Sequence, residues 1–99
     1  MKKIIIRPQA EYDLEESSNW YEIRTEGLGH KFMKTFESQL LSIQSNPLRY
    51  PKKYKNIRIA LIKGFPFVIY FMNEEDHVVV LSVYHTSRNP KKFIKRLKR

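Results

Sequence analysis

Apolar residues recur with a helical period near the start of the chain. Ala10, Leu14 and Tyr21 lie on one stripe, and the acidic residues of this segment fall on the other side. This spacing predicts a helix from Pro8 to about Arg24, in which the proline suits the first turn because its missing N–H needs no partner there. We expect Gly27, in the tight connector that follows, to cap the end of this helix.

A second apolar stripe follows the connector. Phe32, Phe36 and Leu40 recur every four residues, which predicts a helix from about Leu28 to Ser45 that Asn46-Pro47 ends. The two helices are expected to form an antiparallel hairpin. We interpret their aromatic and aliphatic stripes as core rather than as a ligand site.

The remaining apolar runs are short and rich in β-branched and aromatic residues, which predicts strands. Lys63-Gly64 and the acidic segment 73–76 are predicted to be the tight turns between the last three runs, and segment 48–53 is expected to be a loop. Turns this short permit antiparallel pairing but not a parallel crossover. The expected strands span residues 3–7, 55–62, 65–72 and 77–84.

The resulting order is β-α-α-β-β-β, followed by a short C-terminal helix or tail. This order predicts one α+β domain over residues 1–99, with an antiparallel sheet and the N-terminal helical hairpin on one face. The tail, residues 91–99, places Phe93, Ile94 and Leu97 on one side of an amphipathic helix. Because so short a helix is marginal alone in water, we expect it to dock weakly on the sheet.

Charge is distributed unevenly along the chain. The net charge is +9; residues 1–46 hold 6 basic and 7 acidic residues, a net charge of −1, whereas residues 47–99 hold 13 basic and 3 acidic, a net charge of +10. A basic face of this kind suits a polyanion or an acidic protein partner, and the simpler alternative is solubility.

Composition also excludes several classes of site. The chain has no cysteine, so it has no disulfide and no thiolate nucleophile, which fits a reducing cytoplasm. We expect neither a signal peptide nor a membrane span, because no apolar run is long enough for either. The three histidines lack metal-ligand spacing and no glycine-rich phosphate loop occurs, so we expect no metal and no cofactor. The carboxylates of the first helix are interpreted as a solvated face.

The candidate functional residues are basic. His85 and Arg88 follow the last strand, where a rigid scaffold commonly positions functional side chains. Arg58 lies on the second predicted strand, on the face opposite Ile57 and Ile59. Each has a structural alternative: a turn histidine bonded to nearby backbone, an ion pair between Arg88 and a glutamate of the helical hairpin, and a solvent-facing strand charge for Arg58. A basic and aromatic patch, able to contact nucleic acid, is formed by Tyr50, Lys52, Lys53, Tyr54 and Lys55.

Taken together, these features resemble the RelE/ParE superfamily, the toxins of type II toxin–antitoxin modules. The similarity spans nearly the whole chain and is closer to the ParE-like branch. Its most specific part is the ending 83–90, Val-Tyr-His-Thr-Ser-Arg-Asn-Pro, with an aromatic-His-x-x-Arg-x-Pro pattern. The other matching pieces are residues 8–14, Asn46-Pro47, Ile57-Arg58 and residues 65–70.

The resemblance implies a growth-inhibiting toxin of the plasmid-stabilization type, held inactive by a cognate antitoxin. ParE-like members poison DNA gyrase, whereas RelE-like members cut mRNA on the ribosome. If the chain were such a nuclease, His85, Arg88 and Arg58 would be its catalytic residues. In the gyrase case Arg58, Arg88, Lys52, Lys53 and Lys55 would bind the target.

Two departures from the RelE-like pattern favour the gyrase reading. Strand 65–70 has no arginine where ribonuclease members commonly carry one, and Phe93 stands where a catalytic tyrosine would be expected. Ribosome-dependent mRNA cleavage remains the alternative, and a basic binding module without toxicity is a further one. Phe93, Ile94 and Leu97 are predicted to bind the antitoxin.

Overall fold

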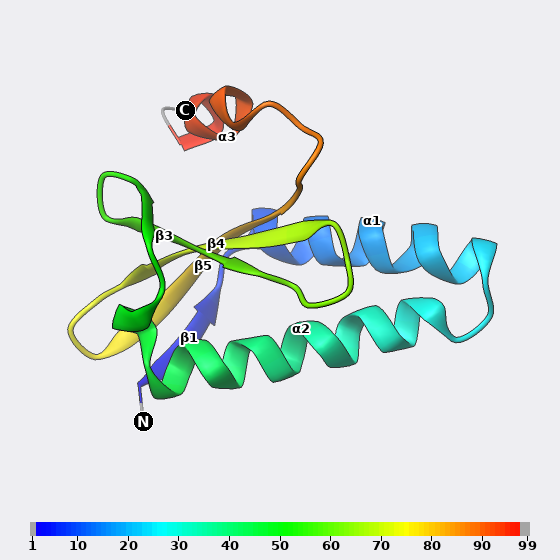
Figure 1. Ribbon diagram of the computed structural model, residues 1–99, viewed down its shortest axis with the longest axis horizontal. Coiled ribbons are helices and arrows are strands. Elements are labelled where there is room, and N and C mark those ends of the chain that lie inside the picture. The colour runs from blue at the N-terminus through cyan, green and yellow to red at the C-terminus, as the bar shows by residue number, and fades with distance from the viewer. Residues whose placement is uncertain (1, 98–99) are drawn as a thin grey trace.

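Two helices follow the first strand, and a third helix follows the last (Figure 1). The computed structural model describes residues 2–97. Both long helices have the predicted bounds. The elements are β1 (Lys3–Ile6), α1 (Pro8–Arg24), α2 (Leu28–Ser45), a 3-10 turn (Pro47–Arg49), β2 (Lys52–Tyr54), β3 (Ile57–Leu61), β4 (Phe67–Asn73), β5 (His77–His85) and α3 (Pro90–Leu97).

The connector between α1 and α2 differs from the expectation. The C-cap of α1 is Thr25, in an extended conformation, and Gly27 immediately precedes α2 with φ +83°. Gly27 therefore supplies the left-handed turn that starts α2 instead of capping α1. The Glu22 carboxylate accepts hydrogen bonds from the backbone N–H groups of Gly27 and Gly29, at 2.7 and 2.9 Å. These bonds stabilise the carboxylate and lower the pKa of Glu22.

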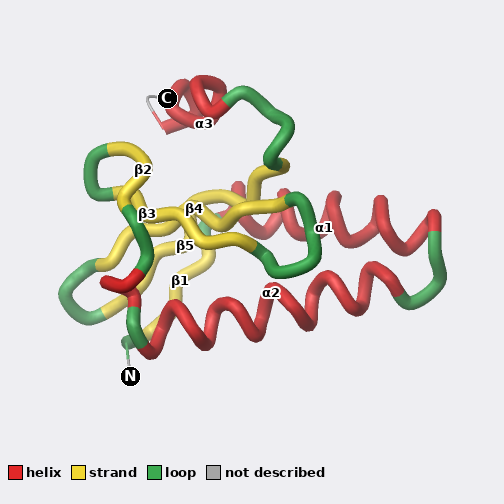
Figure 2. The backbone as a smooth tube through the Cα atoms, in the orientation of Figure 1, coloured by secondary structure: helices red, strands yellow, loops and turns green. Residues whose placement is uncertain are grey.

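The five strands form one mixed sheet in the order β1-β5-β4-β3-β2 (Figure 2). Strands β3, β4 and β5 pair antiparallel, as their short turns predict, but β1 pairs with β5 in parallel. The expectation of a purely antiparallel sheet is therefore wrong at this edge. A parallel pair needs a long connection, and the helical hairpin and three strands lie between β1 and β5 in the sequence.

The other edge of the sheet also differs from the expectation. Segment 48–53 is not a plain loop, because Lys52 begins strand β2 and pairs opposite Arg58 of β3. Lys55 turns the chain with a φ of +49°, so β3 begins at Ile57, two residues later than predicted. The basic segment thus forms a short edge strand.

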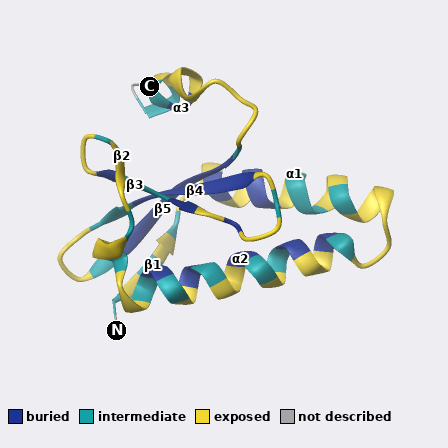
Figure 3. Cartoon of the chain, viewed as in Figure 1, coloured by how far each residue is buried: buried dark blue, intermediate teal, exposed yellow. Residues whose placement is uncertain are grey.

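Helices cover both faces of the sheet. Helices α1 and α2 pack on one face over a core that includes Phe32, Phe36 and Phe71. Helix α3 lies on the other face, where Phe93 packs on Tyr70, as the predicted docking of the tail requires. Strand β5 is buried from residue 78 to residue 84, because it lies inside the sheet with helices on both sides (Figure 3).

A β-bulge in β5 decides which side chains face each helix layer. The pairing of β4 with β5 skips Leu81. Since side chains alternate along a strand, one extra residue reverses the alternation beyond it. Val83 therefore packs beneath the helical hairpin, and Tyr84 packs on the α3 side. His85 consequently lies on the hairpin side, beside Phe67.

Candidate functional site

The candidate site lies where β5 ends and the chain turns toward α3. The Thr86 N–H donates a hydrogen bond of 2.9 Å to the Pro66 carbonyl, which ties this turn to the segment before β4. The Arg88 N–H donates to the His85 carbonyl at 3.1 Å and closes the turn. Residues 86–89 are thus an ordered turn that presents Arg88.

The His85 side chain bonds to the same turn. Its Nδ1 accepts a hydrogen bond of 3.0 Å from the Ser87 N–H, and the Ser87 hydroxyl lies 2.7 Å from the same nitrogen. The ring meets Phe67 edge-on, with 5.0 Å between ring centroids. These contacts agree with the structural alternative for His85, a turn histidine bonded to nearby backbone.

Arg88 is exposed on the surface of the turn. Its guanidinium carbon lies 4.3 Å from the centroid of the Tyr84 ring, a cation–π contact. Neither of the two salt bridges found among residues 2–97 involves Arg88. The alternative of an ion pair with a glutamate of the helical hairpin is therefore not observed. The described structure leaves the charge of Arg88 available to an external anion.

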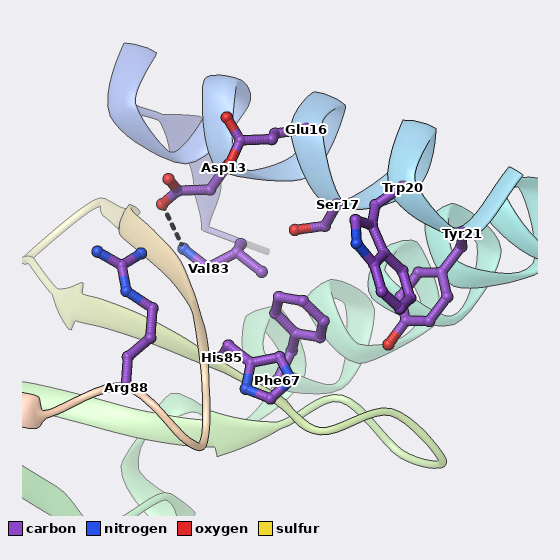
Figure 4. Close-up of a pocket in the computed structure, with 9 residues that line it drawn as sticks. All are labelled: Asp13, Glu16, Ser17, Trp20, Tyr21, Phe67, Val83, His85 and Arg88. Atoms are coloured by element: carbon purple, nitrogen blue, oxygen red, sulfur yellow. Dashed lines mark hydrogen bonds between the residues drawn. The ribbon is translucent and has the colours of Figure 1, made fainter. Parts of the chain in front are cut away.

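A cleft of about 290 Å³ separates α1 from the ends of β4 and β5 (Figure 4). His85 and Arg88 line one side of it. Trp20 and Tyr21 of α1 contribute aromatic surface to the other, together with Glu16. The cleft therefore joins a basic turn to an aromatic and acidic helix face.

Two tyrosines of α1 have raised pKa values. Burial raises the pKa of Tyr21, which lines the cleft. The pKa of Tyr12 is raised because its hydroxyl is hydrogen-bonded to the Glu16 carboxylate.

Asp13 departs most clearly from the sequence interpretation. The sequence interpretation places it on the solvated face of α1, but its exposed fraction is only 7%. One carboxylate oxygen accepts hydrogen bonds from the Ser82 hydroxyl at 2.7 Å and the Val83 N–H at 3.0 Å, and Figure 4 marks the second of these. Arg96 of α3 forms a salt bridge of 3.3 Å to that oxygen and donates to the Ser82 hydroxyl at 2.8 Å. Asp13 thus connects α1, β5 and α3.

The register of the sheet explains this arrangement. Strand β1 ends at Ile6, level with Val80, so β5 continues beyond its neighbour. The N–H of Val83 then needs another acceptor, and a helix carboxylate supplies it. The bulge and the approach of Arg96 are long-range features with no local pattern in the sequence.

Arg58 does not join His85 and Arg88. It pairs opposite Phe71 of β4, whereas His85 pairs opposite Phe67. Four residues along a strand and two strand spacings correspond to about 13 Å and about 10 Å. The Arg58 guanidinium donates a 2.6 Å hydrogen bond to the Tyr50 carbonyl and is partly buried. The predicted basic pair is therefore two separate sites.

Comparison with known proteins identifies the family of this chain. The sequence matches the family described as "ParE toxin of type II toxin-antitoxin system, parDE" over residues 4–90. The chain belongs to this ParE toxin family. A solved structure titled "Chromosomal ParDE TA system from P. aeruginosa" superposes with a TM-score of 0.78 at 15% identity, covering 88% of this chain and 98% of the other. That likeness shows the fold alone. No curated protein matches.

In this ParE-family toxin, the remaining basic candidates gather at the β2 edge. Lys52, Lys53 and Lys55 are all exposed, and Lys55 lies 5.3 Å from the centroid of the Tyr54 ring. Arg58 adjoins them through its pairing with Lys52. We call these four residues the basic edge; it is distinct from the turn that carries Arg88.

The predicted antitoxin-binding side chains of the toxin are engaged within the fold. Phe93 stacks on Tyr70 with 3.9 Å between ring centroids and an exposed fraction of 2%. Ile94 and Leu97 pack against the same cluster. Contact between a partner and Phe93 therefore requires α3 to leave the sheet, whereas Ile94 and Leu97 are only partly buried and line a groove. The role of all three in antitoxin binding stays a prediction.

Residues 2–97 contain neither a metal-binding cluster nor a membrane-spanning helix. No group of three His, Asp or Glu side chains in this range could hold a metal ion. No helix in the same range combines the length and the apolar character needed to cross a membrane.

Proposed function

We propose that this ParE-family toxin inhibits DNA gyrase and that Arg88 is its principal contact with the target. The observation that carries the proposal is the isolation of Arg88, an exposed guanidinium on an ordered turn with no salt-bridge partner among residues 2–97. A planar guanidinium with free donors suits a carboxylate or phosphate on the target. The family match supplies the toxin class, and gyrase is the target we infer from the ParE-like pattern.

The geometry supports inhibition by binding more than it supports RNA cleavage. The nuclease alternative required His85, Arg88 and Arg58 to act together, and Arg58 is remote from the other two. Phe93 has no hydroxyl and is stacked on Tyr70. A ribonuclease reading retains one supporting observation, the shared position of His85 and Arg88 on the same cleft.

Two assays on the purified protein separate these functions. We expect it to inhibit supercoiling by gyrase in a defined reaction and to trap gyrase on DNA. We also expect cell-free translation of a preformed mRNA, which needs no transcription and no gyrase, to proceed at its normal rate in the presence of the protein. Strong and immediate inhibition of translation, with mRNA ends inside codons, would instead establish the ribonuclease alternative.

Toxicity itself has a direct test. Induced expression in a bacterium should arrest growth, and co-expression of the cognate antitoxin should restore it. We propose that this antitoxin is acidic where it contacts the basic edge, since residues 47–99 carry a net charge of +10. Normal growth in the presence of folded, soluble protein would contradict the toxin assignment for this chain.

We further propose that antitoxin binding involves α3. An amphipathic helix of the partner that contacts Phe93 as well as the partly exposed Ile94 and Leu97 would have to replace the stacking of Phe93 on Tyr70. Hydrogen exchange along residues 88–97 should therefore differ between the free and the complexed toxin. Identical protection in both states would show that α3 stays in place and that the antitoxin uses another surface.

A further inference from the structure

The side chain of His85 forms a turn like the Asx turn that asparagine and aspartate commonly make. Its Nδ1 accepts a hydrogen bond from the backbone N–H two residues later, at Ser87. Asparagine and aspartate do the same in Asx turns, where a side-chain oxygen stands in for a backbone carbonyl. In this chain an imidazole nitrogen occupies that position.

Further contacts fix the two ends of the same turn. The Thr86 N–H bonds to Pro66, and the Tyr84 hydroxyl donates a 3.1 Å hydrogen bond to the Asn89 carbonyl. Between these ends two bonds to His85 hold the chain: the Ser87 N–H donates to Nδ1, and the Arg88 N–H donates to the carbonyl at 3.1 Å. The Arg88 guanidinium lies over the Tyr84 ring.

The same hydrogen bond determines where the histidine proton is. A backbone N–H can only donate, so Nδ1 acts as an acceptor and the neutral ring carries its proton on Nε2. A proton on Nδ1 would have to displace the Ser87 N–H. The ring is also held edge-on against Phe67, which limits its rotation.

We propose that His85 is a positioning residue that holds Arg88 in place through Ser87, and that it is not the acid or base of a catalytic pair. This inference rests on the proposed role of Arg88 as the target contact. In this role His85 acts through the lone pair of Nδ1, which accepts the Ser87 N–H. The atom Nε2 contributes at most a fixed N–H donor to the cleft.

Two substitutions separate this role from acid–base chemistry. The side-chain oxygen of His85→Asn lies near the position of Nδ1 and can accept the Ser87 N–H, as in an ordinary Asx turn. The longer His85→Gln places its amide near Nε2 instead and leaves the Ser87 N–H without this partner. Neither amide can exchange protons as an imidazole does, so an acid–base role fails equally in both.

We expect His85→Gln to raise the concentration needed for half-inhibition of gyrase about tenfold, since one lost hydrogen bond corresponds to roughly that change. His85→Asn should retain most of the inhibition shown by the unmodified protein. Unfolding midpoints of both variants verify that each one is folded under assay conditions. Equal activity losses in the two variants, or full activity of His85→Gln, would overturn the proposal.

Measurements on the unmodified protein decide the same question without an activity assay. The ¹⁵N chemical shifts of the His85 ring should show Nδ1 unprotonated and Nε2 protonated at neutral pH, and the Ser87 amide should be protected from hydrogen exchange. A ring protonated on Nδ1 would disprove the inference. If the native protein fails to inhibit gyrase but shows these signatures, the proposed target is wrong and the positioning of Arg88 stands.

Discussion

At the scale of single residues, burial and partners separate side chains that look alike in the sequence. Asp13 and Glu15 lie two positions apart on α1 and were both expected to be solvated. Only Asp13 reaches the open edge of β5, where it accepts the Val83 N–H and pairs with Arg96. Because helix periodicity alone cannot show which strand ends early, this difference was not predictable from the sequence.

The first prediction concerns the Asp13 carboxylate. Replacing it with alanine leaves the Val83 N–H without its acceptor and separates Arg96 from its only salt-bridge partner in the described structure. Removing one member of a buried ion pair costs about 3–5 kcal/mol of unfolding free energy, and the partial exposure of Arg96 places Asp13→Ala near the lower end. Chemical denaturation measures this loss. The matched control Glu15→Ala, on the same helix but exposed, should change stability by only about 0.5 kcal/mol.

The second prediction concerns Arg88. The side chain is exposed, and among residues 2–97 it interacts with the Tyr84 ring, a contact that contributes about 0.5–1 kcal/mol at an exposed site. Arg88→Ala should therefore abolish or strongly weaken growth inhibition while the thermal midpoint hardly changes. Arg88→Lys keeps the charge but loses the planar donor fork, so it should restore toxicity only in part. An unfolded Arg88→Ala protein would instead assign Arg88 a structural role.

At the scale of elements, the sequence predicted the features that depend on residues close together in the chain, such as the bounds of the helices. Both long helices have the predicted bounds, because their apolar stripes, Pro8 at the start of α1 and Pro47 after the end of α2 are local signals. The parallel pairing of β1 and the strand β2 were missed, since each depends on a partner distant in sequence or on an edge with few hydrogen bonds. The bulge at Leu81 was missed for the same reason, and it places His85 on the hairpin side of the sheet.

The third prediction tests how α1 and α2 pack. Gly29 is buried where the two helices meet, and a Cβ atom there would clash with the Ser18 carbonyl oxygen. Gly29→Ala must therefore push the helices apart, and overpacking of this kind typically costs about 1–3 kcal/mol. Denaturation measures the cost. A matched substitution at Ser38, an exposed position of α2, by alanine should have almost no effect.

The fourth prediction concerns the docking of α3. Phe93 is buried against Tyr70, and an eight-residue helix has little stability of its own in water. Phe93→Ala should release α3 and raise hydrogen exchange along residues 90–97, while amides of β4 and β5 stay protected. Lys92→Ala, which changes an exposed neighbour, serves as the control. Unchanged exchange in Phe93→Ala would show that the Arg96 contact to Asp13 is sufficient to hold the helix.

At the scale of the whole molecule, the positive charge is concentrated on particular elements. Helices α1 and α2 belong to the half with a net charge of −1, and the other half carries +10. The basic edge and the Arg88 turn lie on different strands of the sheet, so one partner could cover the first without contacting the second. This separation allows target binding and antitoxin binding to be tested with different variants.

The last prediction uses that separation. An acidic antitoxin should associate quickly at low salt, and its association rate should fall as ionic strength rises, because screening weakens long-range attraction. Reversing the charge of Lys52 and Lys53 to glutamate should slow association at low salt and flatten its salt dependence. The equal reversal of two exposed lysines of α2, Lys31 and Lys34, should have a smaller effect, since these lie outside the basic half of the chain. Stopped-flow measurement of complex formation at several salt concentrations gives both rates. Equal slowing by the two sets would mean that net charge, and not the basic edge, steers the partner.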